Sequence, residues 1–166
     1  GIAYAWHEVD TSRAVTGAPL TQTLRSDRDA TTMQVFGELG YDLMAGSTAI
    51  TPFARLAHVS TESDGFDETG GSAALGVAKA EQETTFLSLG AKARFNAGQP
   101  GFQPYLSAAW NHAFGDRSAR LTSQFAAGGP VFSVVGAAIP KDSAEVEAGF
   151  DYTSGGFTIG AAYSGT

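Results

Sequence analysis

The stretch Thr31–Leu43, TTMQVFGELGYDL, decides the fold class of this 166-residue chain. Its side chains alternate between two sets, one apolar or small and the other bearing an amide and two carboxylates. The first set is Met33, Val35, Gly37, Leu39, Tyr41 and Leu43, and the second is Thr32, Gln34, Phe36, Glu38, Gly40 and Asp42. A period of two is the period of a β-strand, because successive side chains leave opposite faces. The stretch therefore predicts a strand longer than the usual length of about five or six residues.

The same alternation recurs along the chain and predicts about seven main strands. They are expected at Gly1–His7, Thr31–Leu43, Thr48–Ser60, Thr84–Asn96, Phe102–Phe114, Asp142–Tyr152 and Phe157–Ser164. Three of the connections are predicted to be short turns, at Ala45–Ser47, Ala97–Gly101 and Thr153–Gly156.

The remaining connections are long. We expect a polar loop at Glu8–Asp29, an exposed acidic loop at Thr61–Gly71, a short extension at Ala73–Ala80, and a long segment at Gly115–Lys141. The last segment is expected to contain two short paired strands, near Ala119–Phe125 and Val131–Val135. Long and short connections thus alternate, as they do in outer-membrane barrels.

Composition excludes several classes of protein. With 43% hydrophobic and 16% charged residues, the chain is not intrinsically disordered. It has no cysteine, which excludes disulfides and thiolate metal sites. Its net charge of −7 and lack of a basic stripe speak against a nucleic-acid partner. The longest charge-free run, Leu121–Pro140, is interrupted by glycine and proline and does not predict a transmembrane helix.

The two faces of the predicted strands differ in chemistry. Aromatic residues gather near strand ends on the apolar face, as in the interfacial girdles of membrane barrels. The other face carries charges of both signs, which suit a hydrated lumen and would be costly in a dry core. The predicted lumen-facing residues are Gln34, Glu38, Asp42, Arg55, Lys92, Arg94, Asn111, Glu145, Glu147 and Asp151. The prediction is an all-β, antiparallel, up-and-down transmembrane β-barrel.

Five segments resemble one known family, in the family's order. They are QVFGELGYDL (34–43), ITPFARLAHV (50–59), FDETGGSAALGV (66–77), AAWNHAFGD (108–116) and VEAGFDYTSGGFTIGAAYSGT (146–166). From Tyr4 to Thr166 the chain is similar to the C-terminal β-barrel translocator domain of autotransporters, the type V secretion proteins of Gram-negative bacteria. The resemblance implies an outer-membrane barrel of about twelve strands. It also implies a linker helix through the lumen and an N-terminal passenger exported to the cell surface.

Residues 1–166 are expected to form part of such a domain, with its first strands and its last strand missing. The expected partners are the outer-membrane lipid bilayer, the protein's own passenger and linker helix, and the outer-membrane assembly machinery. The lumen charges have two interpretations. They contact the linker or the transiting chain, or they pair with one another and stabilise the barrel wall. Such a fragment alone is not expected to translocate a passenger, because unpaired strand edges are costly.

No residue is predicted to be catalytic or to bind a metal or cofactor. His58 and His112 fall on the apolar face and are interpreted as girdle residues, and the third histidine, His7, suggests no metal site. The acidic spacing in Thr61–Gly71 does not match an EF-hand. Two alternatives stay open: another outer-membrane barrel, porin-like or enzymatic, and a soluble β-sandwich interaction module.

Overall fold

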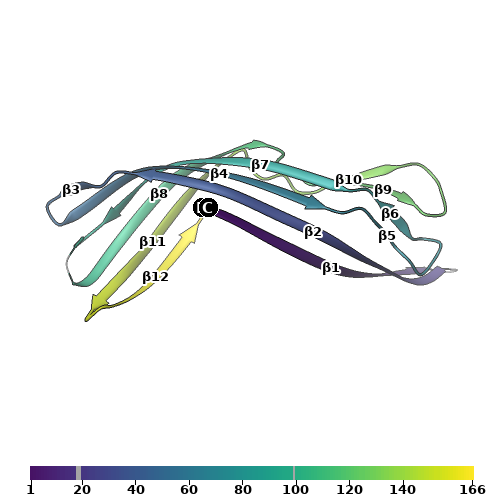
Figure 1. The fold of residues 1–166 in the computed structure, drawn as a ribbon, viewed down its shortest axis with the longest axis horizontal. Coiled ribbons are helices and arrows are strands. Elements are labelled where there is room, and N and C mark those ends of the chain that lie inside the picture. The colour runs from purple at the N-terminus through teal and green to yellow at the C-terminus, as the bar shows by residue number, and fades with distance from the viewer. Residues whose placement is uncertain (18–19, 99) are drawn as a thin grey trace. The chain divides into compact units, whose positions relative to one another are not determined.

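The computed structural model describes residues 1–17, 20–98 and 100–166, and its regular structure there is all β (Figure 1). The strands are β1 (Ile2–Gly17), β2 (Leu20–Gly40), β3 (Leu43–Ala45), β4 (Thr48–Ser63), β5 (Phe66–Asp67), β6 (Leu75–Val77), β7 (Ala80–Arg94), β8 (Gly101–Gly115), β9 (Arg120–Phe125), β10 (Phe132–Val135), β11 (Asp142–Ser154) and β12 (Phe157–Gly165). Within the described ranges, no helix is long and apolar enough to cross a membrane.

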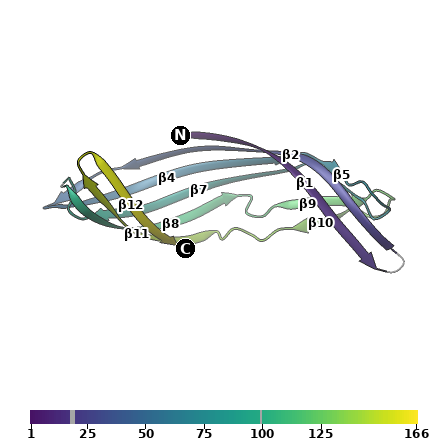
Figure 2. The same cartoon turned by 90° about the horizontal axis from the view of Figure 1, so that it is seen from below.

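The main sheet follows the order of the chain. Its strands are arranged as β1-β2-β4-β7-β8-β11-β12, with β3 paired to β4. This order confirms the predicted up-and-down antiparallel connectivity and the predicted main strands. A second sheet has the order β10-β9-β6-β5, and within it β9 and β10 pair antiparallel as predicted (Figure 2).

The prediction of a loop at Glu8–Asp29 is wrong. β1 and β2 form one continuous antiparallel ladder, from Ile2 opposite Val35 to Gly17 opposite Leu20. After Trp6, the more exposed side of β1 carries polar residues such as Glu8 and Asp10 instead of apolar ones. The amino-acid composition of this part of the strand therefore resembles that of a loop. Ala18 and Pro19, part of that predicted loop, lie outside the described residues.

The predicted acidic loop at Thr61–Gly71 is partly wrong. β4 continues to Ser63, β5 covers Phe66–Asp67, and Thr69 forms an isolated antiparallel bridge with Arg25 of β2. The strand predicted at Thr31–Leu43 also differs in its bounds. It begins earlier, at Leu20, and ends at Gly40, and Leu43 belongs to β3.

The predicted short turns are confirmed where the structure describes them. Gly46 and Ser47 connect β3 to β4, and Gly155 and Gly156 connect β11 to β12. Gly155 and Gly156 have φ angles of +57° and +88°. A two-residue turn of type I′ has positive φ at both central residues, which glycine adopts without steric cost. Gln99, part of the turn predicted at Ala97–Gly101, lies outside the described residues.

The chain divides into two compact units. The loop unit comprises Gly1–Val35, His58–Thr84 and Gly115–Ile139, and contains the long connections. The turn unit comprises Phe36–Ala57, Thr85–Phe114 and Pro140–Thr166, and contains the three short turns. The division therefore separates the long connections of the sheet from its short ones.

Large apolar side chains in the turn unit are exposed. Leu39 is 83% exposed, and Phe157 and Tyr163 are each 81% exposed. Its buried apolar residues, among those described, are the alanines Ala49 and Ala113. A soluble β-sandwich buries its apolar face between two sheets. The exposed apolar face is therefore inconsistent with the β-sandwich alternative.

Candidate functional site: the polar face of the main sheet

β11 shows how the two faces differ in burial. Alternate residues of this strand are half-buried, and the residues between them are exposed. The half-buried set includes Glu145, Glu147 and Asp151, whereas Val146 and Phe150 belong to the exposed set. Exposing apolar surface costs about 25 cal/mol per Å² in water, but not when the surrounding medium is hydrocarbon. The pattern is therefore that of a strand with lipid on its apolar side.

The structure brings several of the predicted polar-face residues together. The Arg55 guanidinium lies 2.7 Å from the Glu38 carboxylate and also donates from Nε at 2.8 Å. Lys92 of β7 reaches across β8: its Nζ lies 3.7 Å from the centre of the Tyr105 ring on β8 and 3.9 Å from Glu147 Oε1 on β11. These contacts link charges of opposite sign across the face.

Two further contacts use neutral donors. Asn111 Nδ2 donates to Glu145 Oε2 at 3.4 Å, and Thr51 Oγ1 donates to Asp42 Oδ1 at 2.5 Å. Arg55, Asn111 and Glu145 also line a small hollow of about 90 Å³, together with Ser88 and Ser107. Polar atoms make up most of the surface of this hollow, as expected where a sheet faces water.

The other predicted residues are placed on strands without a direct ion pair among the described residues. Arg94 and Asp151 lie near enough to Tyr105 to act on its hydroxyl electrostatically. Gln34 is half-buried in the loop unit, opposite Ala3 of β1. The structure thus joins Glu38 to Arg55 and Lys92 to Glu147 directly, but leaves Arg94, Asp151 and Gln34 outside these pairs.

Two aromatic residues on the polar face were not predicted as site residues. The Tyr105 ring covers Gly149, where an added Cβ would lie 2.7 Å from Tyr105 Cζ. In the same way, an added Cβ at Gly90 would lie 2.6 Å from Phe53 Cζ. Each ring approaches the neighbouring strand this closely only because that strand has glycine there. An aromatic residue out of phase with the apolar set, and glycine on the adjacent strand, is the sequence signal for this arrangement.

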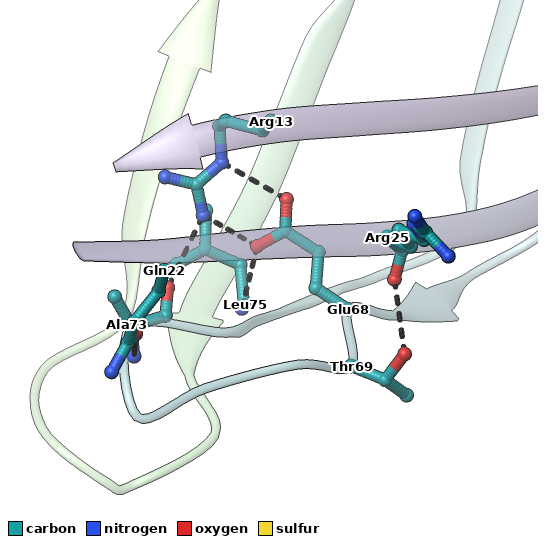
Figure 3. A network of polar contacts seen from close by, with 7 residues as sticks. All are labelled: Arg13, Gln22, Arg25, Glu68, Thr69, Ala73 and Leu75. Atoms are coloured by element: carbon teal, nitrogen blue, oxygen red, sulfur yellow. Dashed lines mark hydrogen bonds and ion pairs between the residues drawn. The ribbon is translucent and has the colours of Figure 1, made fainter. Parts of the chain in front are cut away.

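A separate polar network holds the loop unit together (Figure 3). Arg13 of β1 donates to both carboxylate oxygens of Glu68, at 3.1 Å and 2.5 Å, and to the Ala73 carbonyl at 3.2 Å. The Leu75 amide donates to the same carboxylate at 3.0 Å. The network fastens the segment before β6 onto the β1–β2 hairpin.

Burial and pairing change the chemistry of Glu68. Its side chain is only 8% exposed. The hydrogen bonds from Arg13 hold the pKa of Glu68 below its usual value, against the opposing effect of burial, and the Leu75 amide adds to the lowering. The prediction that this acidic segment is simply solvated is therefore wrong for Glu68. Sequence spacing gives no signal for a pair 55 positions apart.

Aromatic side chains cluster on the apolar face where girdles were predicted. The Tyr4 and Trp6 rings lie 4.5 Å apart, and the His112 ring lies 4.4 Å from that of Phe114 and 5.3 Å from that of Trp110. His112 Nδ1 lies 2.7 Å from Asp142 Oδ1 on the adjacent strand. In the described part of the chain, no group of three or more histidine or acidic side chains is arranged to hold a metal ion.

An antiparallel up-and-down sheet with an exposed apolar face, a charged opposite face and aromatic clusters defines the wall of a membrane β-barrel. Residues 1–164 match the autotransporter β-domain, and the chain belongs to that family. Domains of this family are embedded in the bacterial outer membrane and translocate a passenger across it.

Two curated relatives are similar over most of this chain. Both are extracellular serine proteases of Serratia marcescens, 30% and 29% identical over 153 residues. The matched region covers 91% of this chain but only 15% of each relative. The chain therefore spans about 15% of the length of the curated relatives that it matches.

Proposed function

We propose that this chain forms part of the wall of an outer-membrane barrel, with its apolar face in lipid and its polar face lining the route of the passenger. The observation that carries the proposal is the burial pattern of β11, in which carboxylates are more buried than the apolar residues between them. The proposed lumen-facing residues are Gln34, Glu38, Asp42, Arg55, Lys92, Arg94, Asn111, Glu145, Glu147 and Asp151.

The proposed role of these charges combines two effects. The Arg55–Glu38 and Lys92–Glu147 pairs support mutual stabilisation of the wall. Arg94 and Asp151, which have no ion pair of their own among the described residues, are proposed to meet the linker or the transiting chain. A lumen with mixed charge presents no strong field of one sign, which suits a passage for a polypeptide of varied composition.

We infer that the whole protein carries its passenger ahead of this chain, and that the barrel assembles with the help of the outer-membrane assembly machinery. Any proteolytic activity of the whole protein is assigned to the passenger and not to this chain. The support is that the match to the serine proteases falls on their β-domain region.

A crosslinking experiment on the full-length protein tests this function. A passenger carrying a stably folded domain is stalled during export, and a photoreactive amino acid is placed at Glu145 or at its neighbour Val146. We expect the passenger to crosslink to position 145 and not to position 146, because adjacent residues of a strand face opposite sides. Crosslinking at position 146, or at neither position, contradicts the proposal.

A further inference from the structure

The loop unit contains a hollow whose lining combines arginine side chains with apolar walls, and none of its lining residues belongs to the predicted site. It measures about 260 Å³ and lies on the face of β2 that also carries Gln34. Two arginines, Arg28 of β2 and Arg120 of β9, line it. Its remaining walls are mostly apolar and include Val9, Ala30, Ala80 and Leu121.

Arg28 is held in an unusual state. Its Nε atom is buried and has no hydrogen-bond partner among the described residues. The guanidinium carbon lies 5.3 Å from the centre of the Phe66 ring, a cation–π contact that supplies no conventional hydrogen-bond acceptor for Nε. A buried donor without a partner costs free energy that a bound acceptor would recover.

The charge around the hollow is positive. Glu81 also lines it, and Lys79, which lies outside the lining, pairs both with Glu81, at 3.0 Å, and with Glu62. The lining therefore carries two arginines and one carboxylate, an excess of one positive charge. This local excess stands in a chain of net charge −7, so the hollow is matched to an anionic group rather than to a cation.

We propose that this hollow binds the carboxylate of an acidic side chain of the transported polypeptide. A volume of about 260 Å³ is smaller than the roughly 300–1,000 Å³ of ordinary small-molecule pockets and suits a side chain. The apolar walls suit the aliphatic stem of a glutamate, and a guanidinium binds a carboxylate through charge-assisted hydrogen bonds. The inference rests on the proposed function, because the polypeptide is placed on this face by the lumen assignment.

The test uses the full-length protein in outer membranes. Because this chain contains no cysteine, Ser63 in the lining can be changed to cysteine and labelled with a benzophenone maleimide, with any cysteine elsewhere in the protein replaced. Crosslinked peptides are identified by mass spectrometry in this parent and after Arg28→Met or Arg120→Gln. Arg25→Met is the matched control, because Arg25 lies on the same strand and its exposed side chain leaves the face opposite to that of Arg28. Heat-modifiable gel mobility reports folding, and protease treatment of intact cells reports passenger export.

We expect the crosslink to map to an acidic segment of the same polypeptide. Arg28→Met is expected to lower its yield roughly tenfold, the effect of losing one charge-assisted hydrogen bond, and Arg25→Met to leave it unchanged. Arg120→Gln should also lower the yield, and it keeps the proposal testable if Arg28→Met does not fold. If export is intact, two results overturn the inference: crosslinks only to lipid or to another protein, or a crosslinking yield that neither Arg28→Met nor Arg120→Gln changes. A folded parent barrel that exports no passenger overturns the proposed function, and the inference with it.

Discussion

The loop unit and the turn unit use the same period-two strand pattern, but the stretch around Leu24 in the first and the stretch around Leu39 in the second expose opposite kinds of residue. In the loop unit Leu24 is fully buried, and Ser26, two residues on, is also buried, whereas Asp27 and Asp29, which follow on the opposite face of β2, are exposed. In the turn unit Leu39 and its apolar neighbours on the strand are exposed. The part of the loop unit around Leu24 therefore packs as a protein in water does. The turn unit packs as a protein in lipid does, and so do Ile2 and Trp6 at the start of β1, which belong to the loop unit.

The change between the two regimes occurs inside a single hairpin. The exposed side of β1 carries apolar residues first, Ile2, Tyr4 and Trp6, and then the acidic residues Glu8 and Asp10. A membrane-spanning strand needs about 9–11 residues, whereas β1 has 16 and β2 has 21. The surplus length is the part whose outer side is polar, so these strands extend beyond the hydrocarbon. The position of Trp6 marks the boundary, as an interfacial aromatic residue would.

The largest expected effect concerns the lipid face. Leu39→Arg should impair membrane insertion, because arginine on this face costs roughly 2–4 kcal/mol at the bilayer midplane and less near the interfaces. Gln34→Arg, on the polar face, should be tolerated. The free energy of folding of the intact barrel in lipid vesicles, measured by urea titration, checks this prediction. Equal tolerance of arginine at both positions would reverse or remove the assignment of faces.

The next effect concerns the aromatic contacts of the turn unit. Gly149→Ala should destabilise the barrel by about 1–3 kcal/mol, because the new methyl group overlaps both the Tyr105 ring and the Ala161 carbonyl. Gly37→Ala is the control, since nothing lies within 4 Å of its added methyl. The same urea titration compares the two variants. A loss at Gly37 as large as that at Gly149 would show that the close packing over Gly149 has no special role.

A smaller, local effect is expected in the loop unit. The pKa of Glu68 is lowered in the folded protein, so its stabilisation is present above the ordinary carboxylate pKa and is lost as pH falls through the lowered value. Hydrogen exchange of the Leu75 amide should therefore become faster relative to the intrinsic rate in acid. Glu68→Gln should weaken local protection at neutral pH, by about 1–2 kcal/mol, and flatten its pH dependence. Unchanged pH dependence in this variant would mean that another group is responsible.

The smallest effect is expected at the exposed pair on the polar face. Arg55 and Glu38 have side chains that are nearly half exposed, and such pairs contribute about 0–1 kcal/mol. A double-mutant cycle with Arg55→Ala and Glu38→Ala should give a coupling energy in that range, and salt should reduce it. A coupling of several kcal/mol would indicate that the lumen is drier than proposed.

Sequence alone predicted the turn unit well and the loop unit poorly, for a physical reason. In lipid, the apolar side of a strand must be nearly continuous, so alternation in Asp142–Tyr152 and Phe102–Phe114 is strong and predicts β11 and β8 within a few residues. In water, the outer side of a strand is polar and the inner side is mixed, so Glu8–Asp29 resembles a loop. Strand alternation cannot distinguish a polar strand from a polar connection when neither side is continuously apolar.

The polar contacts were less predictable than the strands. Alternation placed Glu145 and Lys92 on one face, but it carries no register between strands, so the pairing of Lys92 with Glu147 needed the structure. The Arg13–Glu68 pair and the Arg28–Arg120 hollow join segments far apart in the sequence. Such residues come together because a loop folds back onto the sheet. The alternation of side chains within a strand does not predict where the loop makes contact.

A spin-label scan of β11 in outer-membrane vesicles tests the inverted burial of the turn unit. Single nitroxides are placed in turn at each residue from Ala144 to Tyr152, and collisions with oxygen and with a polar nickel complex are measured. Inverted burial predicts oxygen access at Ala144, Val146, Ala148, Phe150 and Tyr152, and nickel access at the residues between them. A profile without a period of two, or one with the opposite phase, would contradict it.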